Sequence, residues 1–250
     1  MADDPAPAER GGIFPATRAS MIERARSDDP QERRRALDAI LSVYWKPVYK
    51  YVRARWSRSV EDAQDLTQEF FTALVDRGTL DAYDPARARL RTFLRSCVDA
   101  LVANRDRDAR RLKRGGDAIP LSLDAETAEG ELLRTGIVAP DRSEDFFEKE
   151  WIRSLFATAV DRLREECAAR GKQVHFTIFA RYDLDDSDGA RPSYADLAQE
   201  LGIKVTDVTN HLAFARRELR RIVLDVLRAT TASEEEFRRE ARSLLGHDPA

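Results

Sequence analysis

Helix-forming residues dominate almost the whole chain, and this feature restricts its fold more than any other. Leu, Ala, Arg and Glu fill the long blocks between the Gly and Pro clusters, and all four favour helices. Alternating β-branched residues are scarce, and we find no Asn-Gly hairpin signal or solenoid repeat. The sequence therefore predicts an all-α fold. Within its first strong helix, at residues 37–55, Pro47 predicts an end or a kink.

Turn residues divide the helical sequence into two blocks. Gly115, Gly116 and Pro120 interrupt the first block, and polar sequence continues to about Pro140, a composition typical of a linker. We therefore predict two small helical domains joined by a flexible linker. The predicted parts are a disordered tail at residues 1–12, a first domain at 13–114, a linker at 115–142, a second domain at 143–230 and a C-terminal extension at 231–250.

The composition excludes several classes of protein. No apolar run approaches the roughly 20 residues that span a bilayer, and the N-terminus lacks a signal-peptide pattern, so we expect a cytoplasmic protein with no membrane partner. Cys97 and Cys167 are too few for a disulfide framework, and the scattered histidines complete no metal site. No nucleophile–base pair or Gly-rich phosphate loop is visible, which predicts a non-enzyme with no catalytic residues, metal or cofactor.

The charges are segregated along the chain, although their sum is close to zero. The chain has 42 Lys and Arg against 45 Asp and Glu, a net charge of −3, which argues against a uniformly basic nucleic-acid binder. Residues 60–76 predict a helix with one apolar and one almost purely acidic face. Like charges at this spacing repel each other, so the acidic face is either simply solvated or a docking surface for a basic partner.

A basic segment follows the acidic helix. Residues 92–113 predict a helix whose second half is rich in arginine, and three further arginines, at 87, 89 and 91, precede it. Clustered arginines on one helix are an electrostatic footprint for phosphate, although basic side chains also favour helix C-termini without any ligand. The pattern alone leaves both interpretations open.

Residues 192–221 carry the most informative pattern in the chain. Ser193 is placed to cap a short helix, and Gly202 suits a tight turn with positive φ before a second helix. This is the signature of a helix-turn-helix, whose second helix meets base edges in the major groove, although an ordinary αα-hairpin shares it. The side chains placed for DNA contact are Thr206, Thr209, Asn210, His211, Arg216 and Arg217.

Several segments, in this order along the chain, resemble a known family. Phe14-Pro-Ala-Thr-Arg, Tyr44-Trp-Lys-Pro-Val-Tyr, Glu61-Asp-Ala-Gln-Asp-Leu-Thr-Gln-Glu-Phe-Phe and Arg91-Thr-Phe-Leu resemble region two of sigma-70-type RNA polymerase sigma factors. Ser193-Tyr-Ala-Asp-Leu-Ala-Gln-Glu-Leu-Gly-Ile resembles the start of the helix-turn-helix of region four. The chain is thus similar to sigma factors of the small, extracytoplasmic-function (ECF) kind over most of residues 14–228.

The resemblance implies a transcription initiation factor that directs bacterial core RNA polymerase to specific promoters and does no chemistry itself. The acidic helix would dock on the β′ clamp helices of the polymerase, and the β flap is a further implied contact. An anti-sigma factor or another regulatory protein is a further partner that the resemblance suggests. The implied core-polymerase-binding residues are Asp62, Asp65, Gln68, Glu69 and Phe70.

The same resemblance implies where promoter DNA binds. The helix-turn-helix would read the −35 element, and the linker would thread toward the active-site channel of the polymerase. The basic helix and the loop before it would recognise and help melt the −10 element. The implied −10 residues are Arg89, Arg91, Asn104, Arg105, Arg107, Arg110 and Arg111.

Alternatives and departures stand beside this expectation. A stand-alone DNA-binding regulator could keep the sigma fold without activating polymerase, and an adaptor could act through protein contacts alone. Lys204 stands where the turn usually ends in a Ser or Thr cap, so either Thr206 caps a helix that starts later or the helix start is frayed. A predicted helix at 233–245 either stabilises the second domain or packs on the helix-turn-helix and masks DNA-binding surface.

Overall fold

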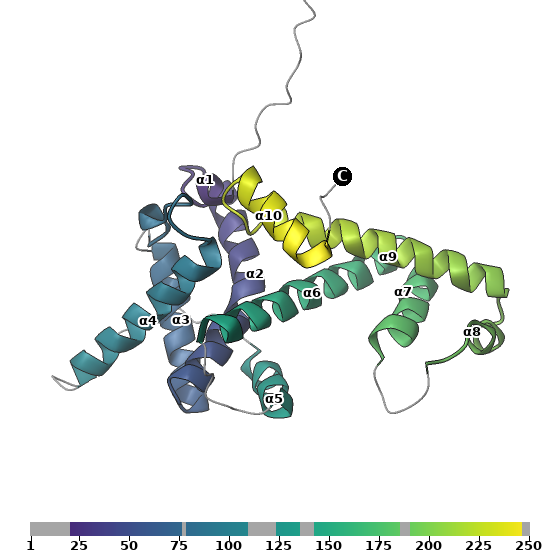
Figure 1. Ribbon diagram of the computed structural model, residues 1–250, viewed down its shortest axis with the longest axis horizontal. Helices are drawn as coiled ribbons and strands as arrows, with labels where there is room; N and C mark the ends of the chain where they lie inside the picture. The colour runs from purple at the N-terminus through teal and green to yellow at the C-terminus, as the bar shows by residue number, and fades with distance from the viewer. Residues whose placement is uncertain (1–20, 77–78, 110–123, 136–142, 186–190, 247–250) are drawn as a thin grey trace, which may run out of the picture.

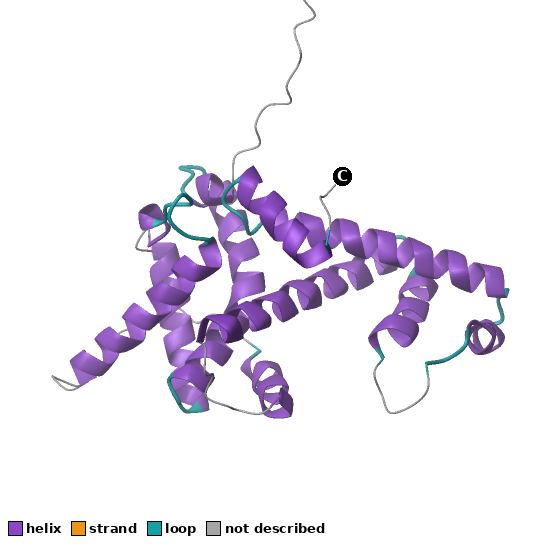
Figure 2. Cartoon of the chain, viewed as in Figure 1, coloured by secondary structure: helices purple, strands orange, loops and turns teal. Residues whose placement is uncertain are grey.

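The chain is all-α over the residues that the structure describes, which confirms the predicted fold class. This computed structural model describes residues 21–76, 79–109, 124–135, 143–185 and 191–246 (Figure 1), so the predicted tail at 1–12 lies outside it. Loops and turns join the helices, with no strand in these ranges (Figure 2). The elements are α1 (Met21–Ala25), α2 (Pro30–Arg55), α3 (Val60–Asp76), η1 (Thr79–Ala82), α4 (Leu90–Ala109), α5 (Ala125–Thr135), α6 (Ser143–Ala169), α7 (Gln173–Phe179), η2 (Ala180–Leu184), α8 (Tyr194–Leu201), α9 (Val205–Arg228) and α10 (Glu234–Leu245).

α2 is the central helix of the N-terminal half. Its start follows the usual chemistry, because Pro30 occupies the first turn and the Asp29 carboxylate accepts a hydrogen bond from the Gln31 N–H at 2.9 Å. Of the two outcomes expected at Pro47, an end or a kink, the end is wrong, since the helix continues through this buried proline to Arg55. Packing of α2 against α1, α3, α5 and α6 offsets the backbone hydrogen bond that proline cannot donate.

α6 connects the two halves of the fold (Figure 1). Its N-terminal end packs on α2, where the Phe147 ring lies edge-on to the Tyr51 ring with centres 5.5 Å apart. Toward its C-terminal end it packs on α9, where the Arg221 guanidinium lies 2.6 Å from the Glu166 carboxylate. One hydrophobic cluster therefore runs from the α1–α4 bundle along α6 to α7, α8 and α9, and it includes Cys167, the thiol expected in the core.

The interval predicted as a linker contains a helix that the sequence analysis did not predict. α5 has 11 residues and begins where the Asp124 carboxylate accepts a hydrogen bond from the Thr127 N–H at 3.1 Å. The helix packs on α2 through three buried apolar side chains, Ala125, Ala128 and Leu132. The polar composition and Gly130 argue against a helix in this interval. The Asp124 cap and the spacing of the three apolar residues are nevertheless sequence signals that indicate one.

The C-terminal extension forms α10, as predicted. The Ser233 hydroxyl accepts a hydrogen bond from the Glu236 N–H at 3.1 Å, and Gly246 ends the helix with a φ of 75°. α10 packs on the C-terminal part of α9, where the Arg228 guanidinium lies 4.1 Å from the centre of the Phe237 ring. The alternative in which this helix masks the helix-turn-helix is therefore wrong, because the start of α9 lies at the other end (Figure 1).

Candidate polymerase and nucleic-acid interfaces

α3 presents the predicted acidic face to solvent. Ser59 precedes the helix as its cap, and its hydroxyl accepts a hydrogen bond from the Asp62 N–H at 3.1 Å. Asp62 and Asp65 are exposed, and no Lys or Arg in the described ranges forms an ion pair with either. Glu69 is less exposed and pairs with Arg105 of α4. Two exposed carboxylates three residues apart are thus available to a basic partner.

Phe70 differs from the other residues expected to bind core polymerase. Its side chain is only 3% exposed and packs edge-on against Phe71, with ring centres 5.0 Å apart. It therefore supports the acidic face from the core and offers no contact surface of its own in this structure. Gln68 is half-buried at the border of the face.

α10 covers Arg91, one of the arginines expected to bind the −10 element. Arg91 is 6% exposed, and its guanidinium lies 2.6 Å from the Glu240 carboxylate, 2.7 Å from the Glu148 carboxylate and 4.6 Å from the centre of the Trp151 ring. Burial lowers the pKa of Arg91, but the two carboxylates outweigh it and leave the pKa above its usual value. In this arrangement Arg91 is a buried, paired cation.

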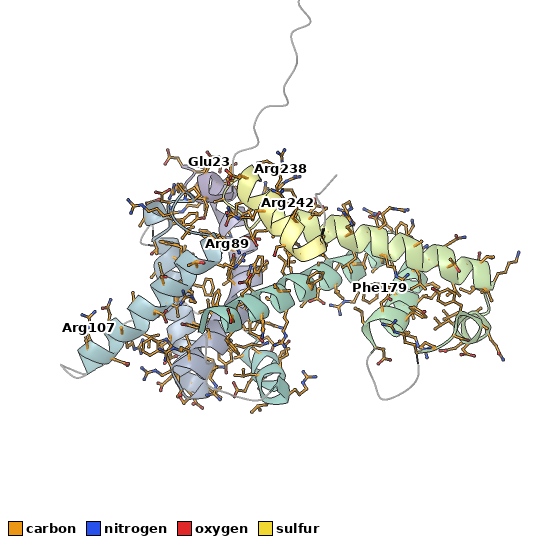
Figure 3. All side chains as sticks on the ribbon, in the orientation of Figure 1. Glu23, Arg89, Arg107, Phe179, Arg238 and Arg242 are labelled. Carbon is orange, nitrogen blue, oxygen red and sulfur yellow. The ribbon has the colours of Figure 1, made fainter. Side chains whose placement is uncertain are left out.

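The same helix also caps α4. The Glu236 carboxylate accepts hydrogen bonds from the Leu90 N–H at 3.2 Å and from the Ala232 N–H at 2.8 Å. Arg89 lies 3.2 Å from the Glu240 carboxylate, and Figure 3 shows its side chain beside α10. Residues almost 150 positions apart in sequence thus complete the start of α4.

A basic cavity of about 260 Å³ opens beside this start. Its lining has one acidic residue and several basic ones, so an anion would find a positive field there. The lining residues are Arg87, Ala88, Arg89, Arg91, Thr92, Arg95, Phe147 and Glu148.

The second half of α4 is exposed on one side and paired on the other. Asn104, Arg105 and Arg107 are exposed, and Arg107 lies toward the free end of the helix (Figure 3). Asp99 accepts hydrogen bonds from Tyr51 and Trp56, and Asp106 pairs with Arg58, so these two acids face inward partners. Arg110 and Arg111 lie outside the described residues.

The helix-turn-helix has the local chemistry that its sequence predicts. Ser193 and Asp196 form a reciprocal capping box at the start of α8, and Gly202 turns the chain with a φ of 63°. α9 starts at Val205 without any cap from Thr206, so the expectation of a later or frayed start is wrong. Instead, the Asp207 carboxylate accepts a hydrogen bond from the Lys204 N–H at 3.2 Å.

The candidate −35 residues separate into open and engaged side chains. Thr206, Thr209 and Asn210 are exposed at the start of α9, where a helix-turn-helix reads bases. Arg217 is also exposed, with its side chain at 69%. Arg216 is engaged, because two of its nitrogens each lie 2.8 Å from the Asp183 carboxylate.

His211 also points inward, against another histidine. Its ring stacks on His175 of α7 with centres 3.8 Å apart, and the Phe214 ring lies edge-on to His175 at 5.0 Å. Burial lowers the pKa of His175, and the charges of His211 and Lys172 lower it further. His211 thus fixes α7 against α9 rather than reaching toward DNA.

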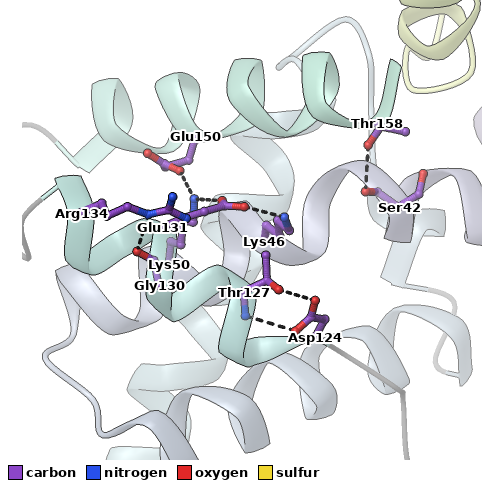
Figure 4. A network of polar contacts seen from close by, with 10 residues as sticks. All are labelled: Ser42, Lys46, Lys50, Asp124, Thr127, Gly130, Glu131, Arg134, Glu150 and Thr158. Carbon is purple, nitrogen blue, oxygen red and sulfur yellow. Dashed lines mark hydrogen bonds and ion pairs between the residues drawn. The ribbon is translucent and has the colours of Figure 1, made fainter. Parts of the chain in front are cut away.

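A second ionic cluster, which sequence analysis missed, joins α2, α5 and α6 (Figure 4). Lys46 and Lys50 donate to the Glu131 carboxylate at 2.7 and 2.6 Å, and Lys50 also donates to Glu150 of α6 at 2.7 Å. Burial raises the pKa of Glu131, but the two lysines outweigh it and hold the pKa below its usual value. The signal available in the sequence was the pair of lysines, Lys46 and Lys50, one turn apart within the largely apolar segment at residues 40–52.

Neither a metal centre nor a membrane span emerges from the part of the chain that the structure describes. Within it, no group of three or more His, Cys, Asp or Glu side chains is placed to hold a metal ion. No helix there is both long and apolar enough to cross a bilayer.

The comparisons with known proteins agree with the order of these surfaces along the chain. A family profile described as ECF sigma factor matches residues 19–225, which include the acidic face, the basic helix and the helix-turn-helix. The chain belongs to the ECF sigma factor family. Comparisons with curated proteins and with solved structures give no significant match.

Membership fixes the general role of this sigma factor. ECF sigma factors are non-enzymatic transcription initiation factors that bind core RNA polymerase and promoter DNA, and anti-sigma factors often regulate them. The matched region ends at residue 225, before α10.

Proposed function

We propose that this sigma factor directs core polymerase to promoters that carry −10 and −35 elements, and that it does so in the cytoplasm. Residues 13–114 would form the region-two-like unit and residues 143–230 the region-four-like unit. Residues 115–142, apart from the docked α5, would pass toward the polymerase active-site channel. Residues 231–250 form an extension that this role does not require.

One observation carries the proposal: the start of α9 is exposed behind a well-formed turn. Asn210 can pair with both hydrogen-bonding groups of an adenine edge, and Thr206 and Thr209 can reach neighbouring bases or a thymine methyl group. Arg217 is 69% exposed and makes only a long ion pair of 3.9 Å with its neighbour Glu218, so it can turn to hold a phosphate. These side chains support −35 recognition by α9.

The −10 element is assigned to α4 and the cavity beside its start. Asn104, Arg105 and Arg107 are exposed on α4, and Arg87 and Arg89 line the cavity. Arg91 would join them only if α10 moved, because Glu240 and Glu148 hold it in this arrangement.

Core polymerase is assigned to the acidic face of α3. Asp62 and Asp65 would meet the β′ clamp helices, with Glu69 and Gln68 at the border and Phe70 supporting them from below. The β flap would contact the region-four-like unit.

The test is reconstitution of bacterial core polymerase with the full chain, followed by sequencing of the promoters that open. Asp62→Ala with Asp65→Ala should weaken binding to core polymerase several-fold, because each exposed pair contributes roughly 0.2–1 kcal/mol. Asp161→Ala removes an equally exposed aspartate on α6 and serves as the matched control.

Two outcomes would refute the proposal. Core polymerase binding that is absent, or unchanged by the two α3 substitutions, would remove the assigned interface. Operator binding without polymerase, retained after deletion of residues 1–114, would favour a stand-alone regulator instead.

A further inference from the structure

One face of α2 carries a row of hydrogen-bond donors that α5 covers. Lys46, Tyr49, Lys50 and Arg53 recur at steps of three, one and three residues, so they lie along one side of the helix over about 10 Å. We call these four residues the α2 row. They lie within the family match, but none of them belongs to the assigned polymerase and promoter surfaces.

Two carboxylates of α5 together accept hydrogen bonds from every member of the α2 row. Glu131 accepts from Lys46 at 2.7 Å and from Lys50 at 2.6 Å. Glu129 accepts from the Tyr49 hydroxyl at 2.8 Å and from Arg53 Nε at 2.9 Å, and a second Arg53 nitrogen reaches its other oxygen. Arg53 and Glu129 therefore form a bidentate ion pair.

This donor set is the one that proteins use to hold phosphates. A forked guanidinium, a tyrosine hydroxyl and two ammonium groups all donate hydrogen bonds, and three of the four groups are cations. The carboxylates of Glu129 and Glu131 stand where phosphate oxygens would bind. Arg53 lowers the pKa of Glu129, so that carboxylate is charged when it holds this place.

The attachment of α5 is mainly ionic. Its 11 residues are too few for a stable isolated helix, and its apolar contact with α2 comes from two alanines and one leucine, while Leu133 is 61% exposed. A competing polyanion therefore needs to replace two carboxylates and little buried apolar surface. The proposed passage of the linker into the polymerase would pull α5 away in the same manner, and on this one point the inference rests on the proposed function.

The surroundings of the α2 row favour a nucleic acid. A cavity of about 350 Å³ adjoins it, lined by the two lysines of the row, by Glu131 and Arg134 of α5, and by Glu150, Arg153, Ser154 and Ala157 of α6. When α5 leaves, Arg153 and Ser154 remain there as donors beside the row, with Glu150 as the one acidic residue. At the other end, Trp56 donates to Asp99 of α4 at 3.1 Å, so the row leads toward the helix assigned to the −10 element. The half-buried Trp45 ring, 5.7 Å from the Lys46 ammonium, offers an aromatic face of the type that bases stack on.

We infer that the α2 row is a second nucleic-acid site, which binds the phosphate backbone of single-stranded DNA once α5 leaves it. In the free protein α5 is an internal occupant of this site. Displacement of α5 frees two cations, Lys46 and Arg53, next to α4, while Lys50 keeps its partner Glu150 on α6, so a melted strand could continue from the −10 surface onto α2.

The experiment measures binding of a fluorescent oligothymidylate of about 20 nucleotides to the full chain, without polymerase or promoter sequence. Glu129→Gln with Glu131→Gln should bind about tenfold more tightly than the parent at low salt, since the Lys46 and Arg53 cations become available. The slope of log affinity against log salt should steepen by about 1.4, the value for two phosphate contacts on a single strand.

The matched control is Glu126→Gln with Glu235→Gln, which removes the same number of charges from exposed positions that form no ion pair in the described structure. It should change binding by less than about twofold. Adding Lys46→Gln and Arg53→Gln to the first variant should abolish its gain, and circular dichroism confirms that each variant remains helical.

Three results would overturn the inference. The first is equal binding by the two Glu→Gln pairs. The second is a gain that survives the loss of Lys46 and Arg53. The third is competition by polyglutamate as strong as that by the oligonucleotide at equal charge, which would assign the row to an acidic protein segment. None of these measurements uses polymerase. The α2 row can therefore prove not to bind DNA while the proposed function holds, and the proposed function can fail while the α2 row still binds DNA.

Discussion

The start of α4 and the start of α9 are both expected to meet promoter DNA, yet the first is covered by another helix and the second is exposed to solvent. At α4, Arg91 is buried under α10 and held by Glu240 and Glu148. At α9, Asn210 and its neighbours are exposed, and the helix start is completed locally by Asp207. One surface is thus ready for DNA, whereas the other is closed by a segment from the opposite end of the chain.

The difference shows that sequence pattern identifies charge but not accessibility. A row of arginines before a helix looks the same whether it faces solvent or a distant carboxylate. A local turn such as that at Gly202 depends only on residues within a few positions, so its geometry can be predicted from the sequence.

Substitution of Glu240 tests the closed surface and should have the largest effect. Glu240→Ala leaves Arg91 buried with one remaining partner, Glu148. Removing one member of a buried ion pair typically costs 3–5 kcal/mol, and we expect a loss of about 3 kcal/mol in the free energy of unfolding, measured by urea denaturation.

Two variants sharpen that result. Glu235→Ala changes an exposed neighbour on the same helix and should stay within about 0.5 kcal/mol of the parent. Arg91→Met with Glu240→Leu should recover most of the loss, because apolar residues can replace a buried ion pair. A loss below about 1 kcal/mol for Glu240→Ala would mean that α10 does not hold Arg91 in solution.

Substitution of Asn210 tests the open surface and should give the opposite pattern. Asn210→Ala should leave the free energy of unfolding almost unchanged, because the side chain is exposed. Binding of the holoenzyme to its promoter should weaken by about 2 kcal/mol and lose selectivity at one base pair, as measured with promoter variants. Equal weakening on every promoter variant would contradict base recognition by this residue.

Arg217 should have a smaller and less selective effect. Arg217→Ala should weaken binding to all promoter variants alike and reduce the salt slope of affinity by about 1, because one phosphate contact is lost. Arg216→Ala is the informative comparison, since Arg216 is already bound to Asp183. A salt slope that falls equally for both would show that Arg216 also reaches DNA.

The histidine stack should give the smallest effect. The pKa of His175 lies below its usual value, so the unfolded chain binds a proton that the folded chain resists. Stability is therefore present above the unfolded pKa of about 6.5 and is lost as the pH falls below it toward the lower folded pKa. Melting temperatures of the parent and of His175→Gln should converge at the lower pH, and parallel curves would exclude this contribution.

The parts of the fold that sequence predicted are those set by local periodicity. The buried side of α3 contains Ala63, Leu66 and Leu74, as their spacing required, and α8 has its capping box at Ser193. These features need only one turn of helix for their explanation.

The parts that sequence did not predict depend on contacts between distant segments. Pro47 stays helical because neighbouring helices pack around it, and α5 is a helix because it docks on α2. Arg91 and His211 were assigned to DNA by their positions in motifs, but tertiary partners more than 30 residues away take their side chains. Charge and spacing cannot reveal a partner whose position only the complete fold defines.

The continuous α6 helix has a mechanical consequence. Its 27 residues form a rigid rod of about 40 Å, with α2 against one end and α9 against the other. A tilt of about 10° at the α2 end would swing the far end through about 7 Å, which is two base-pair steps of DNA. Side chains at the near end, such as Phe147 packed on Tyr51 of α2, thus form the pivot that sets where the start of α9 points without touching a base.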